Sequence, residues 1–293
     1  MSSTAVGGKV GSVAGELAER ALADAERATR TAGVRVRAAG TVAELRELIA
    51  VGDAVWGPNG TYAVNELRAL TFAGGVVLGA YELGDKSSGP IGFLVGFLGW
   101  SGGLHLHSHQ TGVMPACRSR GVGYALKLNQ RAVCLSHGVQ EVRWTFDPLM
   151  RRNTAFNLRR LGAHAHQFLP DFYGQMEDAL NSDDLSDRLE AVWRLAEPIP
   201  VAFEGAPEVG RGAPAAVLAD VNGWPHRTSV PPRPGSHVAV PAEFGQLRQR
   251  EPQRARAWRL AVRQVLEQAY GTGLHIGDVD GYGYLLTQGA HLG

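Results

Sequence analysis

The sequence has 293 residues, 44% of them hydrophobic, which is enough to bury a substantial core as one large domain or two modest ones. Its formal charge of +1, from 29 Lys and Arg against 28 Asp and Glu, gives no overall field that would draw the chain to nucleic acid or to a membrane surface. Two cysteines, Cys117 and Cys134, are too few for a disulfide scaffold and lack zinc-site spacing, and no signal segment or bilayer-spanning apolar run is present. We therefore expect a cytoplasmic protein that uses no metal.

The first part of the chain predicts an arm, then strands and a helix. Residues 1–33 are expected to form a flexible N-terminal arm, mobile or loosely docked, because a polar, Ala-rich helix over Glu16–Thr29 would have little to bury. Regular structure should start with a strand near Val34 and a helix over Val42–Trp56, followed by a turn at residues 57–60. Three further strands are predicted, with a hairpin turn at residues 84–90 between the first two: Gly75–Leu83, Ile91–Gly99 and Leu104–Val113.

From about residue 100 onward, strands lead into helices, which favours an α/β layer with a mixed sheet. A loop at residues 115–121 is followed by a helix at 123–136, a strand at 141–145, a helix at 153–161 and a strand at 163–169. Gly162 stands where a helix C-cap is expected.

Beyond Trp193 the composition changes, because nine prolines fall within residues 198–241 and interrupt long regular elements. Order should return with an amphipathic helix over Gln253–Tyr270 and short strands at Leu274–Val279 and Gly281–Leu286. We read residues 34–199 as the main domain and residues 200–293 as a smaller C-terminal accessory region.

The segment from Val113 to Gly123 is the strongest functional feature. A strand ends, Pro115 stops the pairing, and a glycine-containing loop opens a helix whose first backbone N–H groups and positive dipole end suit an anionic phosphate. Gly121 and Gly123 let a bulky diphosphate approach, although such a pair also occurs where backbones simply pack closely. A Rossmann loop fits less well, because its third glycine would fall at Leu126, and the Gly-Lys-Ser/Thr of a Walker loop is absent.

The longer pattern, Val-x-Pro-x-x-Arg-x-x-Gly-x-Gly at residues 113–123, resembles the acyl-CoA-binding motif of the GNAT superfamily of N-acyltransferases. The following strand, the helix bearing Asn153 and the closing Gly162 are also similar to that superfamily. The resemblance covers about residues 34–200 and implies an α/β (α+β) fold with a mixed, mostly antiparallel central sheet flanked by helices. Segments such as 144–149 and 171–174 resemble a branch that includes amino-acid N-succinyltransferases.

The resemblance implies that acetyl-CoA or succinyl-CoA binds as cosubstrate, with its diphosphate on the loop and its pantetheine arm along the strand. The predicted cofactor-binding residues are Val113, Met114, Arg118, Ser119, Arg120, Gly121, Val122 and Gly123, together with Asn153 and Phe156 on the later helix.

Acylation of an amine requires a base for the ammonium proton and a proton for the departing thiolate. His109 is the preferred base because it lies nearest the strand end, although it also fits a half-exposed strand histidine. Many superfamily members carry a tyrosine four residues before the helix-ending glycine, but here that position is Leu158, so Tyr173 is taken as the substitute acid or as a turn residue. Asp147 follows a strand, where it either contacts ligand or caps a turn.

The sequence thus predicts an N-acyltransferase that moves an acyl group to a primary amine, for example of an amino acid, by direct attack in a ternary complex. A non-catalytic acyl-CoA-binding sensor or scaffold is the alternative, favoured by Leu158. The expected partner is a small-molecule amine rather than nucleic acid or membrane, and a homodimer is left open.

Overall fold

The computed structural model describes residues 7–58, 60, 62–84, 88–174, 184–200 and 214–289. The chain divides into two compact units, and each is described by itself. The first unit runs to Arg143 and includes Arg194–Ala196, while the second holds the described residues from Trp144 onward apart from those three. This division falls inside the predicted main domain, whose boundary at residues 199 and 200 stays a prediction. Parts of the predicted arm, turns and accessory region, at residues 1–6, 59, 85–87 and 201–213, lie outside the described residues.

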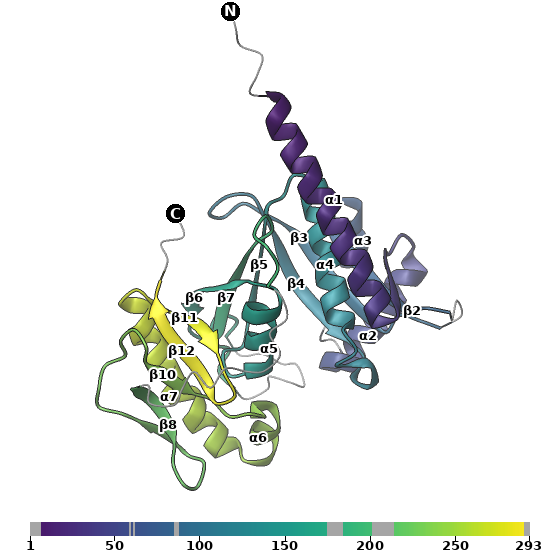
Figure 1. Ribbon diagram of the computed structural model, residues 1–293. Coiled ribbons are helices and arrows are strands. Elements are labelled where there is room, and N and C mark those ends of the chain that lie inside the picture. The colour runs from purple at the N-terminus through teal and green to yellow at the C-terminus, as the bar shows by residue number, and fades with distance from the viewer. Residues whose placement is uncertain are drawn as a thin grey trace, which may run out of the picture. The chain divides into compact units, whose positions relative to one another are not determined.

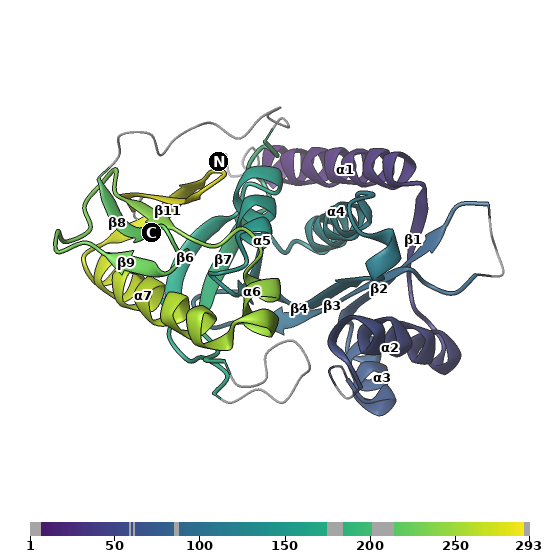
Figure 2. The same cartoon turned by 90° about the horizontal axis from the view of Figure 1, so that it is seen from below.

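In the first unit, an antiparallel sheet is formed by neighbouring strands β1 (Val34–Ala38), β2 (Val76–Glu82), β3 (Gly92–Gly99) and β4 (His105–Val113). Strand β5 (Glu141–Phe146) joins β4 in parallel, and the unit boundary crosses β5. Helix α4 (Val122–Ser136) covers one face of β2, β3 and β4, and helices α2 (Val42–Trp56) and α3 (Val64–Phe72) cover the other (Figure 2). The predicted mixed, mostly antiparallel sheet flanked by helices is confirmed.

The core of this unit lies between α2 and the sheet. Leu45 and Leu48 of α2 pack against Phe93 of β3, and all three side chains are buried. Helix α2 begins with a capping box, in which Thr41 Oγ1 accepts the Glu44 N–H at 3.2 Å and the Glu44 carboxylate accepts the Thr41 N–H at 2.9 Å. The Thr-x-x-Glu sequence therefore fixes where the helix begins.

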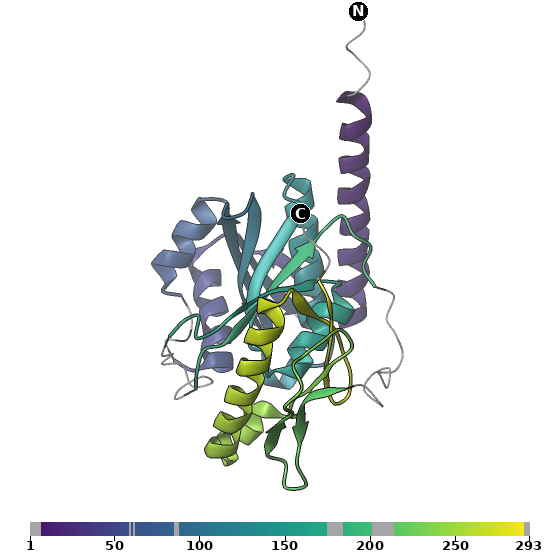
Figure 3. The same ribbon diagram turned by 90° about the vertical axis from the view of Figure 1, so that its left-hand side faces the viewer.

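An additional helix, α1 (Gly7–Ala32), packs along α4 (Figures 1 and 3). Its contact face is a stripe of buried alanines at helical spacing: Ala21, Ala25, Ala28 and Ala32. On the same helix, Asp24 accepts a hydrogen bond at 3.0 Å from the buried Arg131 of α4, whose Nε donates to the Leu195 carbonyl at 3.0 Å. The sequence predicted a flexible arm, mobile or loosely docked, with little to bury. The structure gives a closely packed helix, because small alanines allow close approach to the face of α4 that the sheet leaves uncovered.

The second unit starts at the end of β5. Helix α5 (Arg151–Ala155) continues as a π-helical turn, η2 (Phe156–Arg160), and the chain reverses at Gly162, whose φ of 76° suits glycine. Strands β6 (His164–Leu169) and β7 (Arg188–Arg194) pair antiparallel, in the strand order β5-β7-β6. The predicted helix at 153–161 thus corresponds to α5 and η2.

The rest of the second unit consists of a sheet of short strands and two helices. The strand order is β11 (Leu274–Val279), β12 (Gly283–Gln288), β10 (His237–Ala239), β8 (Ala215–Ala219) and β9 (Pro225–Arg227). Helix α6 (Phe244–Arg250) precedes α7 (Pro252–Gly271), and α7 packs on β6 as well as on β8, β9 and β11. The predicted last helix and last two strands are confirmed, and they belong to one packed unit with α5 and β6.

Candidate functional site

Strand β4 carries a β-bulge at the predicted base. Gln110 pairs with Val95 of β3 and Ser108 pairs with the next residue, Gly96, so His109 is an extra residue in β4. A bulge leaves its extra residue outside the regular ladder and redirects the side chain, and such irregularities are frequent beside active sites. The structure therefore singles out His109 by its backbone as well as by its chemistry.

The rings of His107 and His109 lie on one face of β4, with centroids 5.7 Å apart. Tyr62 and Phe97 flank His109, at centroid distances of 5.5 and 6.0 Å. Burial and the neighbouring imidazoles lower the pKa of His107 to about 4. The surrounding protein atoms also lower the pKa of His109 by partial desolvation, although the residue as a whole is exposed. At neutral pH His109 is therefore an uncharged imidazole that can accept a proton.

The predicted phosphate loop connects β4 to α4. After Val113, a single 3-10 turn, η1 (Pro115–Cys117), leads to Gly121, which is the N-cap of α4 and has no side chain to cap it. The first intrahelical bond runs from the Ala125 N–H to the Gly121 carbonyl at 2.9 Å, so the N–H groups of Val122 and Gly123 lie ahead of it. A helix start of this kind offers backbone donors and a positive dipole end to an anion.

The two glycines of the loop have different reasons to be glycine. Gly121 has a φ of 88°, a left-handed conformation that disfavours any side chain. Gly123 is different, because a Cβ there would meet only Val113 Cγ2, at an ordinary 3.8 Å. If close packing of the backbone were the reason for glycine at position 123, a Cβ there would be too close to neighbouring atoms. Contacts within the described chain therefore do not require glycine at this position.

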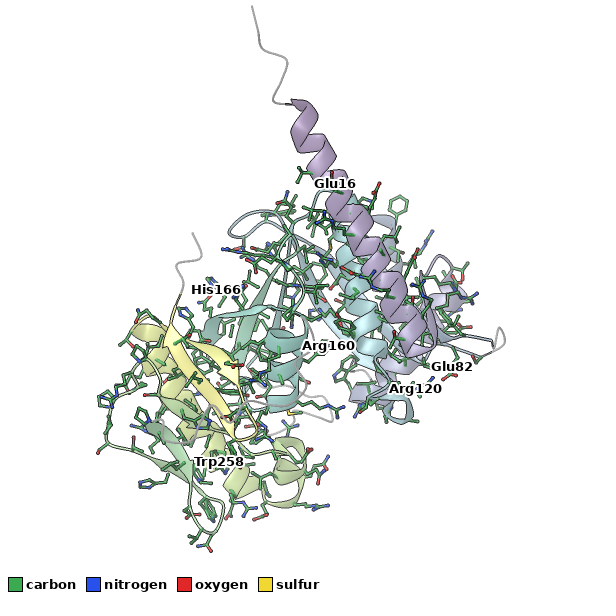
Figure 4. All side chains as sticks on the ribbon, in the orientation of Figure 1. Glu16, Glu82, Arg120, Arg160, His166 and Trp258 are labelled. Atoms are coloured by element: carbon green, nitrogen blue, oxygen red, sulfur yellow. The ribbon has the colours of Figure 1, made fainter. Side chains whose placement is uncertain are left out.

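The two arginines of the loop are not equivalent. Arg120 forms an ion pair with Glu82 of β2, with Nη1 and Oε1 2.6 Å apart (Figure 4). Arg118 lies back over the loop, with its Nε donating to the Val113 carbonyl at 3.4 Å. The Glu82 carboxylate thus occupies one edge of the Arg120 guanidinium, and the predicted part of both arginines in cofactor binding stays a prediction. Ser119 between them has a strained φ of 67°.

Met114 and Val122 contribute to this region through the backbone rather than the side chain. The Met114 N–H donates to the Ile91 carbonyl at 2.9 Å and its side chain packs on the core beneath α2. The Val122 side chain is buried, and its backbone opens the helix.

Asp147, in the second unit, is held in an ion-pair network. Both of its carboxylate oxygens accept hydrogen bonds of 2.7 Å from Arg259 of α7, and one also accepts the Leu149 N–H at 2.8 Å. Arg259 is shared with Asp184 at 2.8 Å. Burial alone would raise the pKa of Asp147, but the Arg259 guanidinium outweighs it and holds this pKa below the usual value. Such a carboxylate binds protons poorly, and its contact with the Leu149 N–H fits the turn-cap interpretation, while its catalytic role stays a prediction.

Tyr173 lies beside strand β5 within the second unit. Its hydroxyl is 3.0 Å from Thr145 Oγ1, and the Arg188 guanidinium stands 5.3 Å from the centre of its ring. The side chain is 41% exposed, so its hydroxyl is accessible for proton transfer as well as bonded to a neighbour. Neither the predicted acid role nor the turn interpretation is decided by these contacts.

Asn153 and Phe156 both lie on the helix that follows β5. Asn153 is exposed, and its backbone N–H donates to the Met150 carbonyl at 2.8 Å. Phe156 is half-buried and begins η2, which also holds the half-buried Leu158. The predicted residues thus fall into two groups: His109 and residues 113–123 in the first unit, and Asp147, Asn153, Phe156 and Tyr173 in the second.

Sequence reasoning missed a polar cluster beneath β4, formed by Ser108 with Lys127 and Gln130 of α4, all buried. One signal was available, since Lys127 and Gln130 stand three residues apart amid apolar residues of a predicted helix. Their burial depends on which face of α4 packs on β4, and this packing is a tertiary contact that the local sequence does not specify.

Among the described residues, no group of three or more His, Cys, Asp or Glu side chains is arranged to hold a metal ion. None of the described helices is both long enough and apolar enough to cross a membrane.

No family model matches the sequence, and no curated protein matches it. Solved structures with a similar fold include the ribosomal-protein-S18-alanine N-acetyltransferase from Escherichia coli, at 13% identity and a TM-score of 0.45, with 58% of this chain and 97% of that one covered. Another is an N-acetyltransferase from Staphylococcus aureus, at 14% identity and a TM-score of 0.44, covering 55% and 98%. A candidate acetyltransferase of the GNAT family from Desulfovibrio desulfuricans has 16% identity and a TM-score of 0.43, covering 55% and 99%. Because each TM-score is below 0.5, function is inferred from the residues of the site.

Proposed function

We propose that this protein is an acyl-CoA-dependent N-acyltransferase of the GNAT type, which transfers an acetyl or succinyl group to a primary amine of a small molecule, for example an amino acid. The observation that carries the proposal is the helix start at Gly121–Gly123. It combines uncapped backbone donors with a glycine at position 123 that no contact within the described chain requires. An acyl-CoA diphosphate is an anion of the size and charge that such a helix start accommodates.

The cosubstrate is assigned to the loop mainly through its backbone. N–H groups from Arg118 to Gly123 would bind the diphosphate, and Val113 and Met114 at the end of β4 would lie along the pantetheine arm. Arg118 adds a guanidinium that is held only by a long hydrogen bond. Asn153 and Phe156 are retained as pantetheine contacts on the resemblance of their helix to the superfamily. A cytoplasmic location, where acyl-CoA is formed and used, belongs to the same proposal.

The reaction balances with one base and one proton relay. His109, uncharged at neutral pH, accepts a proton from the substrate ammonium directly or through a water. The free amine attacks the thioester carbonyl, the C–S bond breaks, and the second nitrogen proton passes to the thiolate, which leaves as free thiol. Tyr173 or water supplies the proton relay to sulfur.

The first experiment is titration calorimetry of the full chain with acetyl-CoA, succinyl-CoA and free coenzyme A. Thiol release against a panel of L- and D-amino acids and other small amines follows. We expect at least one thioester to bind, and one class of amine to release thiol. Absence of binding by all three ligands would refute the assignment of the loop.

The loop assignment is tested by comparing Gly123→Glu with Gly123→Ala. Neither side chain meets a close contact at Cβ, and a glutamate in the first turn favours the helix, so both variants should fold at least as stably as the natural chain. Gly123→Glu should abolish acyl-CoA binding because it places a negative charge against the diphosphate. Gly123→Ala should weaken binding only in part. Unchanged affinity in Gly123→Glu would mean that the ligand binds elsewhere.

A non-catalytic acyl-CoA-binding sensor or scaffold is the second candidate. Leu158 favours it, because a leucine stands where many superfamily members carry the tyrosine that protonates the thiolate. Tight acyl-CoA binding without thiol release across the amine panel would support this alternative over the transferase.

A further inference from the structure

A compact polar cluster lies inside the first unit, on the face of β4 that is covered by α4. Lys127 Nζ donates to Ser108 Oγ at 2.8 Å, and Gln130 Nε2 donates to the same oxygen at 3.0 Å. Lys127 Nζ also lies 3.4 Å from Gln130 Oε1. All three side chains are at most 4% exposed. Burying a lysine ammonium and an amide costs free energy unless their polar atoms form hydrogen bonds. Both side chains meet this requirement by donating to the same serine oxygen.

The serine in this cluster is the residue next to the bulge. Ser108 pairs with Gly96 of β3, and the extra residue, His109, follows immediately. Glycine at position 96 leaves the space that the amide uses, since a Cβ there would lie 3.1 Å from Gln130 Nε2 and 3.0 Å from Leu106 Cδ2. Three elements, β3, β4 and α4, are therefore fitted together at one point.

The cluster also determines which residue of β4 is the extra one. A strand can accommodate an extra residue at any of several neighbouring positions. Each choice of position would place different side chains on the two faces of the sheet. Because Ser108 Oγ must meet two donors from α4, Ser108 has to face α4. His109 is then left as the extra residue, beside the rings of Tyr62 and Phe97.

We propose that Lys127 and Gln130 are positioning residues for the base: they hold Ser108, and thereby fix the bulge that presents His109 at a set distance from the start of α4. The inference rests on the proposed function for its catalytic meaning. Lys127 lies five residues after the first residue of α4, so one rigid helix carries both the loop and the anchor. Misplacement of a catalytic group by about 1 Å can cost on the order of 10²-fold in rate.

The anchor does not depend on the charge of the lysine. Burial lowers the pKa of Lys127 to about 7, and either protonation state keeps N–H groups for Ser108. The titratable groups coupled to it are Cys134 on α4, whose thiol pKa burial raises to about 12, and His107 on β4. The thiol therefore stays neutral, and the proposal predicts a positional effect.

The test uses Lys127→Met in the full-length chain, which keeps the length of the side chain but removes its donor. Leu128→Met, at a buried position on the same helix, is the matched control for core packing. We expect acetyl-CoA affinity in Lys127→Met within about threefold of the natural chain and kcat lower by about tenfold with little change in KM for the amine. In a His109→Ala background, Lys127→Met should cause no further loss, because the two residues act through one group. Leu128→Met should match the natural chain.

Nuclear magnetic resonance of the His109 ring gives a readout that needs no turnover. We expect Lys127→Met to shift the His109 Cε1–Hε1 resonance and its titration midpoint, and Leu128→Met to leave both in place. If Lys127→Met does not fold, Gln130→Met removes the second donor in the same design. An unchanged His109 resonance, or an equal loss of kcat in both His109 backgrounds, would overturn the positioning role. Absence of turnover in the natural chain would sink the proposed function alone.

Discussion

His109 illustrates how one residue acquires its properties from two sources. The sequence places it near the end of a strand that leads into the loop. The structure adds the bulge that makes it the extra residue of β4 and the ring environment that lowers its pKa. A histidine with a lowered pKa is uncharged over the whole neutral range, as a base for an ammonium group requires.

This environment predicts the pH dependence of the reaction. If His109 is the base as proposed, it accepts a proton only when uncharged, so kcat/KM should rise with pH through a pKa below the usual 6.5 of histidine and be flat by neutral pH. His109→Ala should lower turnover by about 10²-fold and remove the acidic limb. His137→Gln, which changes an exposed histidine at the end of α4, is the control and should keep the limb. A limb that persists in His109→Ala would return His109 to a structural role.

Asp147 shows the opposite outcome at the residue scale. A carboxylate after a strand is a reasonable ligand group by sequence, since open α/β sheets bind ligands at strand ends. Its partner, Arg259, is 112 residues away, and no local pattern connects the two. Once both carboxylate oxygens are bound by the guanidinium, the side chain binds protons poorly.

At the scale of elements, α4 is the central helix of the first unit. It begins at the loop, carries the Lys127 anchor and lies between the sheet and α1. Its nearly complete burial follows from this arrangement, since one side faces β2, β3 and β4 and the other faces the alanine stripe of α1. The position of the loop relative to β4 therefore depends on packing from both sides.

The docking of α1 can be tested through its buried ion pair. Asp24→Asn leaves Arg131, with a side chain only 5% exposed, without an anionic partner, so we expect a loss of about 1–3 kcal/mol in the free energy of unfolding. Glu26→Gln removes a charge from the same helix, but its partner Arg30 is exposed, and the loss should be below about 0.5 kcal/mol. Urea denaturation measures both. Equal, small effects would mean that α1 is not held on α4.

At the scale of the whole molecule, the C-terminal region is part of the second unit rather than an appendage. Helix α7 packs on β6, and its Arg259 binds Asp147 and Asp184. Trp258 beside it donates to the Gly223 carbonyl at 2.9 Å, which ties α7 to the turn between β8 and β9. Removal of α7 would take away the guanidinium that bonds both Asp147 and Asp184, so we do not expect the second unit to fold without it.

A single substitution tests whether α7 stabilises the second unit through Arg259. Arg259→Met should cost about 3–5 kcal/mol in unfolding free energy, since two carboxylates lose their shared cation. Arg256→Met, at an exposed position of the same helix, should have little effect. The lowered pKa of Asp147 sets the sign of the pH dependence: its stabilisation is present above the unfolded value and is lost as pH falls through the folded one. Equal stability of the two variants would contradict the network.

The sequence alone determined what depends on neighbouring residues. Strand and helix periods and the strand–loop–helix passage around Gly121 and Gly123 are local, so they could be predicted within a few residues. The tertiary structure decided what depends on distant partners: the docking of α1, the pairing of Asp147 with Arg259 and the anchoring of Ser108 by α4. These outcomes are set by packing and desolvation between segments as much as 112 residues apart, and periodicity carries no information about such pairs.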